Sequence, residues 1–117
     1  MDRRSFLKCM TAASAATVFR FHSAAAQSRR AKNVVLVHGL FADGSCWSGV
    51  IARLQVAGLN AVAVQNPLTT FDDSVAETRR VLAEQDGPTV LVGHSFSGMI
   101  LSEVGNDPTV SLSLIHI

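Results

Sequence analysis

Cysteine and charge are both scarce in this sequence of 117 residues, and each shortage excludes something. The only two cysteines are Cys9 and Cys46. Cys9 lies in a segment that we expect to be removed, so no internal disulfide is predicted. Charged residues make up 16% of the chain against 48% apolar residues, a composition typical of a folded domain rather than of a disordered chain.

Motifs for cofactors, metals and nucleic acids are also missing. The sequence has no glycine-rich P-loop, no G-x-G-x-x-G pattern and no metal-ligand spacing, so we expect no cofactor and no metal. Outside the first 26 residues, basic residues gather only at Arg29, Arg30 and Lys32, which gives no support for nucleic-acid binding. The mildly apolar run over residues 9–19 is too short and too polar for a membrane span.

Residues 1–26 have the pattern of a twin-arginine export signal. Arg3 and Arg4 open the motif R-R-x-F-L-K, an Ala- and Thr-rich run follows, and residues 24–26 offer an A-x-A cleavage site. The alternative is an ordinary amphipathic N-terminal helix. The export interpretation predicts contact with the export machinery and a mature protein that is periplasmic or secreted.

The last six residues, 112–117, resemble the translation of a transposase mosaic-end adapter used in preparing sequencing libraries. On that interpretation the native sequence stops near Ser111, and residues 27–111 are the domain itself. The alternative is a genuine β-strand, because the segment is short, apolar and rich in strand-forming residues.

Between these ends, apolar runs and helical patterns alternate along the chain. Strands are predicted over residues 33–39, 60–65 and 89–93, helices over 47–57, 75–85 and 96–105, and a further strand begins at 109–111. Short loops between apolar strands predict the α/β class: a parallel sheet with helices on both faces, truncated to about half of a domain.

Several single residues carry structural expectations. In the predicted helix over residues 75–85, Val75, Thr78, Val81 and Leu82 should face inward. Asp43, Asp72 and Asp73 are expected to cap helices, and Asp107 to stabilise a turn. Cys46 is expected to be a buried thiol, since it has no neighbouring base and no metal-ligand spacing.

Residues 93–98, GHSFSG, follow a short apolar strand and open a helix, which is the context of a nucleophile elbow. The turn is so tight that the residues two before and two after the serine must be small, and here they are Gly93 and Ser97. The usual pattern is G-x-S-x-G, so Ser97 is a departure that still meets the size requirement. Ser95 is therefore the candidate nucleophile.

Two further segments complete a resemblance. Residues 34–47 (VVLVHGLFADGSCW), the N-P-L loop at 66–68 and residues 87–98 together resemble the α/β-hydrolase superfamily, closest to its esterase-like members. The resemblance implies a serine hydrolase of carboxylic esters that acts through an acyl-Ser95 intermediate. The backbone N–H groups of Leu40 and Phe96 would then form the oxyanion hole.

The side chains of Leu40, Phe41 and Phe96 suggest an apolar wall around the substrate, with Phe41 in the pocket, and hence a small ester with an apolar part. His38 is expected to hydrogen-bond backbone and shape the oxyanion loop, and His94 to pack behind the sheet. In the superfamily the catalytic acid and histidine follow later strands, so this chain is expected to lack both and to be inactive. Alternatives are a cofactor-free perhydrolase, a lyase, or a non-catalytic binding protein on the same fold.

Overall fold

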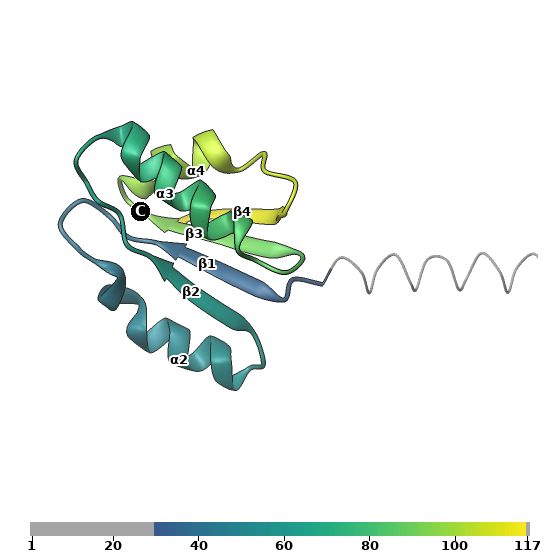
Figure 1. Cartoon of the computed structure of the whole chain (residues 1–117). Helices are drawn as coiled ribbons and strands as arrows, with labels where there is room; N and C mark the ends of the chain where they lie inside the picture. The colour runs from purple at the N-terminus through teal and green to yellow at the C-terminus, as the bar shows by residue number, and fades with distance from the viewer. Residues whose placement is uncertain (1–29, 117) are drawn as a thin grey trace, which may run out of the picture. The chain divides into compact units, whose positions relative to one another are not determined.

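A four-stranded parallel sheet forms the centre of residues 30–116, the part of the chain that the structure, a computed structural model, describes. The strands are β1 (Asn33–Val37), β2 (Asn60–Val64), β3 (Thr89–His94) and β4 (Val110–His116). Their order is β2-β1-β3-β4, and each neighbouring pair is parallel (Figure 1). The predicted α/β class and parallel sheet are confirmed.

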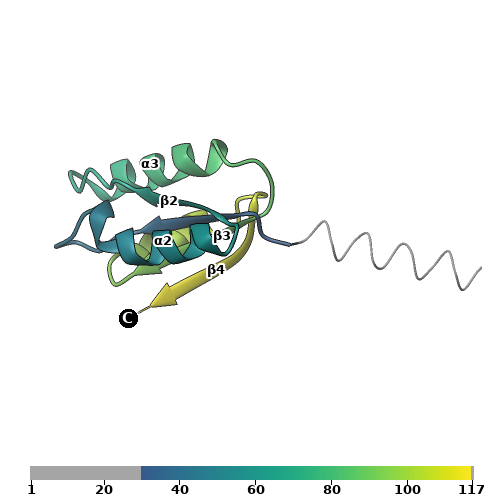
Figure 2. The same ribbon diagram turned by 90° about the horizontal axis from the view of Figure 1, so that it is seen from below.

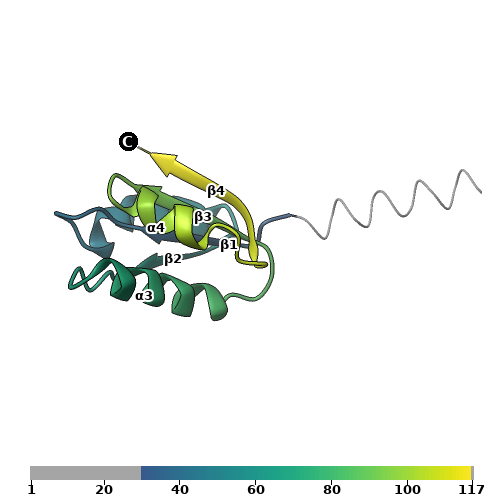
Figure 3. The ribbon, with the colours of Figure 1, turned by 90° about the horizontal axis from the view of Figure 1, so that it is seen from above.

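Helices cover both faces of this sheet. The helical elements are the 3₁₀ turn η1 (Gly44–Trp47), α2 (Ser48–Val56), α3 (Phe71–Ala83) and α4 (Ser97–Val104). Figure 1 shows α2 on one face and α3 with α4 on the other, and Figure 3 views the side of α3 and α4. The arrangement follows the expectation of a sheet buried between two helical layers.

Strand β1 is buried along its whole length, and its side chains divide between the two layers. Val34 and Leu36 join the apolar cluster under α2. Val35 and Val37 point the opposite way into the larger cluster under α3 and α4. Because alternate side chains of a strand point to opposite faces, five consecutive apolar or buried positions need helices on both sides.

Helix α3 begins at Phe71, four residues before the predicted start at residue 75. Thr70 is its N-cap, with the hydroxyl accepting the N–H of Asp73 at 3.0 Å. Asp72 and Asp73 therefore lie in the first turn, where negative charge suits the helix dipole, and are not the caps that the sequence suggested. The four residues predicted to face inward are all buried, as the periodicity required.

The predicted helix over 47–57 is divided into η1 and α2. The side chain of Asp43 accepts the N–H of Ser45 at 2.8 Å, so this aspartate caps the 3₁₀ turn as expected. Gly58, directly after the helix, has a φ of +84°, a conformation that glycine adopts without strain.

Strand β4 lies at one edge of the sheet and is covered poorly. Figure 2 views the α2 side, where β4 extends beyond the helix. Leu112 and Leu114 are 58% and 54% exposed, beside half-buried Val90 and Val92 of β3. One edge of the sheet and part of one face thus expose apolar side chains.

The two end segments remain predictions. The proposed export signal, residues 1–26, lies outside the described residues. Residues 112–116 of the proposed adapter segment form the outer part of β4, so they adopt the strand that the alternative interpretation foresaw. Within residues 30–116, no helix is both long and apolar enough to cross a membrane.

Candidate active site

The order in which successive strands are added to the sheet reverses between β1 and β3: β2 is added on one side of β1, and β3 and then β4 on the other. After β1 it continues into η1 and α2, whereas after β3 it enters α4 on the opposite face. In open parallel sheets, such a switch point leaves a crevice at the carboxyl ends of the two strands, and ligands bind there. A hollow of about 220 Å³ lies at this place, lined by Gly39, Leu40, Phe41, Ala42, His94 and Ser95.

Ser95 is exposed at the tip of the turn between β3 and α4. Its φ is +57°, and among the described residues only Leu68 is another non-glycine with a positive φ. Such a conformation costs on the order of 1–3 kcal/mol and is concentrated at functional sites. The strand, the sharp turn and the helix that the GHSFSG segment predicted are all present.

Two glycines allow the parts of the site to approach each other. A Cβ on Gly93 would lie 2.7 Å from both Leu101 Cδ1 and Ser97 Oγ, so no larger residue fits without a shift of the turn. A Cβ on Gly39 would lie 3.2 Å from the carbonyl oxygen of His94 and 3.4 Å from Ser95 Cβ. The turn after β1 therefore packs directly against the turn that carries Ser95.

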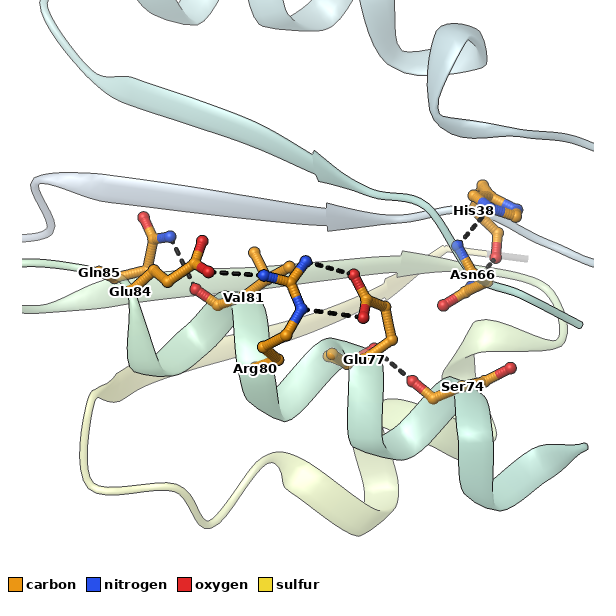
Figure 4. Close-up of polar contacts among 9 residues, drawn as sticks. His38, Asn66, Ser74, Glu77, Arg80, Val81, Glu84 and Gln85 are labelled. Carbon is orange, nitrogen blue, oxygen red and sulfur yellow. Dashed lines mark hydrogen bonds and ion pairs between the residues drawn. The ribbon is translucent and has the colours of Figure 1, made fainter.

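His38 is 1% exposed and links three backbone groups. Its Nε2 accepts the N–H of Asn66 at 3.0 Å, so the proton of the neutral ring is on Nδ1, which donates to the carbonyl oxygen of Gly39 at 2.8 Å. Asn66 Nδ2 donates in return to the His38 carbonyl at 3.1 Å (Figure 4). The expectation that His38 hydrogen-bonds neighbouring backbone is confirmed.

This contact fixes the direction of the Leu40 N–H. Gly39 C=O and Leu40 N–H belong to one trans peptide, so they point in opposite directions, and the carbonyl is held toward the buried ring of His38. Neither the Leu40 nor the Phe96 N–H donates to another group among the hydrogen bonds of the described residues. Both N–H groups are thus unpaired within the described residues; Leu40 lines the hollow, and Phe96 directly follows Ser95.

The partnership of His38 with Asn66 was missed from the sequence. Asn66 is 5% exposed, and its Oδ1 is buried without a hydrogen-bond partner. In the sequence the N-P-L segment only contributes to the family resemblance, and nothing local shows that its asparagine faces a histidine 28 positions earlier. Only the pairing of β1 with β2 brings the two residues together.

His94 does not pack behind the sheet, so that expectation was wrong. Its side chain is exposed and lines the hollow, and its ring centroid is 5.9 Å from that of His116. The reason lies in the register, because β1 ends at Val37, opposite Gly93, while β3 continues for one more residue. His94 therefore stands beyond the part of the sheet that the helices cover.

Two other expectations are corrected. Cys46 is exposed and not buried, because η1 has no buried residue and faces solvent. Of the three apolar residues expected around the substrate, Leu40 and Phe41 line the hollow, at 48% and 103% exposure. The Phe96 ring instead packs edge-on against Phe71, with a centroid distance of 6.4 Å.

The acidic residues near the site have structural roles. Hydrogen bonding by Ser45 holds the pKa of Asp43 below its ordinary value, as expected of a capping carboxylate. No cluster of three or more metal-ligating side chains occurs within residues 30–116. The Ser95 hydroxyl makes no hydrogen bond to any described residue, so no base contacts it there.

Solved structures of similar fold include a novel pyrethroid hydrolase from Sphingobium faniae JZ-2, with a TM-score of 0.64 at 20% identity. A structure of a PytH variant gives a TM-score of 0.63 at 21% identity. Each match covers 74% of this chain but only 39% of the other protein, so this chain spans well under half the length of either. None of the curated proteins compared matches it in sequence.

A family model described as the alpha/beta hydrolase family matches residues 34–116, which include β1, both turns of the hollow and β4. The match covers more than half of the chain. This chain belongs to the alpha/beta hydrolase family.

Proposed function

We propose that this chain is the nucleophile-bearing part of a serine hydrolase that cleaves carboxylic esters through an acyl-Ser95 intermediate. The observation that carries the proposal is the placement of Ser95. It is exposed in a strained turn at a switch point, directly against a loop whose N–H groups are free. Family membership and the hydrolase named among the similar structures support it.

In this mechanism, Ser95 Oγ attacks the ester carbonyl carbon while a base takes the hydroxyl proton. The negative charge that develops on the carbonyl oxygen is stabilised by the N–H groups of Leu40 and Phe96, each contributing a few kcal/mol. The alcohol leaves with a proton, and water then releases the acid from Ser95. No described residue hydrogen-bonds the Ser95 hydroxyl, and the proposal assigns the base and its acid partner to segments outside the described residues.

The substrate proposed is a small ester with an apolar acyl or alcohol part. Leu40 and Phe41 line the hollow with exposed apolar surface. Contact of this surface with water is unfavourable, so covering it with an apolar group of the substrate would stabilise the complex. Export through the twin-arginine signal, to the periplasm or outside the cell, is part of the same proposal. So is the origin of residues 112–117 in an adapter, which sequencing the gene beyond the codon for Ser111 would test.

The chemical test compares hydrolysis of p-nitrophenyl butyrate by the 117-residue chain and by an extended form, each with and without the substitution Ser95→Ala. In the 117-residue chain we expect no rate above that of Ser95→Ala, because the serine lacks a base. In a form extended by the gene's own continuation, we expect a rate that Ser95→Ala abolishes.

The matched control is Ser102→Ala, since Ser102 is an exposed serine on α4 whose hydroxyl bonds only the carbonyl of Gly98. It should keep the full rate in the extended form. Hydrolysis by the extended form that persists in Ser95→Ala would refute the assignment of the nucleophile. A Ser95-dependent rate in the 117-residue chain would instead refute its proposed inactivity.

A further inference from the structure

The hydroxyl of Ser97 makes three contacts at the end of the β1–β3 ladder. Its Oγ accepts the N–H of His94 at 2.6 Å and lies 2.9 Å from the carbonyl oxygen of Val37. The carbonyl oxygen of His94 is 2.8 Å away, and the single hydroxyl proton can be donated to one of these two carbonyls at a time. Ser97 is completely buried, so no bulk water competes for these groups.

This hydroxyl links the two strands just where their pairing stops. The last paired residues are Val37 and Gly93, and His94 follows without a partner on β1. By joining the His94 N–H to the Val37 carbonyl, Ser97 adds one connection beyond the ladder. The glycine that is usual at this position has no side chain to supply it.

The same contacts close the turn that contains Ser95. His94 stands before the nucleophile and Ser97 stands two residues after it, and the hydroxyl joins the backbone of the first to the second. Phe96, the N-cap of α4, makes no side-chain capping bond that could hold the turn in its place. These contacts act on the strained turn together with two backbone bonds of Ser95 itself, from its N–H to the His116 carbonyl and from the Gly98 N–H to its own carbonyl.

We propose that Ser97 is a positioning residue, whose buried hydroxyl ties the turn carrying Ser95 to the end of β1. Through this tie it fixes the Phe96 N–H relative to the loop that carries the Leu40 N–H. The proposal deepens the function proposed above, and rests on it only where catalysis is measured.

The test is amide hydrogen exchange and NMR of the full chain, which needs no chemistry at Ser95. In Ser97→Ala, the His94 amide should exchange at least about tenfold faster, and the Ser95 and Phe96 amide resonances should shift. The control is Ser74→Ala, which removes an equally buried hydroxyl that bonds the carbonyl of Thr70 in α3. It should leave the amides of residues 94–96 unchanged.

Ser97→Gly, which restores the usual residue, should behave as Ser97→Ala does and keeps the test decisive where alanine impairs folding. If either Ser97 variant matches Ser74→Ala at residues 94–96, the proposal is wrong. In a form that hydrolyses esters through Ser95, Ser97→Ala should also lower kcat about tenfold with KM unchanged. A change in KM alone would overturn the positioning role, while an absence of ester hydrolysis would overturn only the proposed function.

Discussion

Replacement of Gly93 by alanine tests whether close packing, and not backbone conformation, dictates the first glycine of the GHSFSG turn. The added Cβ would lie 2.7 Å from Leu101 Cδ1 and 2.7 Å from Ser97 Oγ, well inside the roughly 3.5–4.0 Å of ordinary carbon contacts. Leu101 is 2% exposed and Ser97 is fully buried, so neither side chain has space into which to move. Overpacking of this kind costs about 1–3 kcal/mol, and two simultaneous overlaps favour the upper end.

Urea unfolding of the full chain measures this cost, with Gly49→Ala as the matched control. A Cβ on Gly49, in the exposed α2 helix, meets nothing within 4 Å, so alanine there should raise the free energy of unfolding by about 0.5–1 kcal/mol. Gly93→Ala should lower it by about 3 kcal/mol, with a fall in Tm of about 12 °C or more. A Gly93→Ala chain within about 0.5 kcal/mol of the unsubstituted protein would refute the packing argument.

Three further predictions concern strain, the buried histidine and acid stability. The free energy of unfolding should be about 1 kcal/mol higher for Ser95→Gly than for Ser95→Ala, because glycine adopts a φ of +57° without strain. Equal urea midpoints for the two variants would argue against strain at this position. His38→Leu leaves two buried backbone groups unpaired, at a cost of about 1–3 kcal/mol each, whereas His38→Asn keeps a donor near the Gly39 carbonyl. The asparagine variant should therefore lose less stability in urea than the leucine variant. The reverse order would contradict the contacts of His38. Hydrogen bonds from Thr109 lower the pKa of Asp107 in the folded state. The contribution of Asp107 to the free energy of unfolding is therefore complete above about pH 4 and is lost as the pH falls through the folded pKa. Asp107→Asn should make the stability fall less steeply at acid pH, and an unchanged slope would exclude this role.

The fold could be predicted from the sequence because its signals are local and agree with one another. Strands β1, β2 and β3 are apolar runs bounded by turn residues, and the inward face of α3 follows directly from helical periodicity. The start of α3 was misplaced because both Thr70 and Asp73 are residues that favour caps. Which of them caps depends on where the backbone turns, and that is set by packing of the helix on the sheet.

In the candidate site, too, residues with local signals could be identified and residues that depend on strand pairing could not. Ser95 could be identified because the strand, the turn and the helix around it follow one another without a break over residues 89–104. Asn66 could not, because its contact with His38 exists only after β1 and β2 have paired. His94 was misplaced for a related reason, since its exposure depends on β3 outlasting β1 by one residue.

That one-residue difference between β1 and β3 explains much of the site's construction. If β1 continued beside His94, the ladder would occupy the Val37 carbonyl and the chain could not turn at Gly39 toward the hollow. Because β1 ends, the turn that follows it can place the Leu40 N–H next to the turn of Ser95. The ends of β1 and β3 then lack further ladder hydrogen bonds and need other contacts to fix them. His38 with Asn66 secures the first of them and Ser97 the second. The geometry around Ser95 therefore depends on contacts within this chain, from His38 and Asn66 at one strand end and from Ser97 at the other.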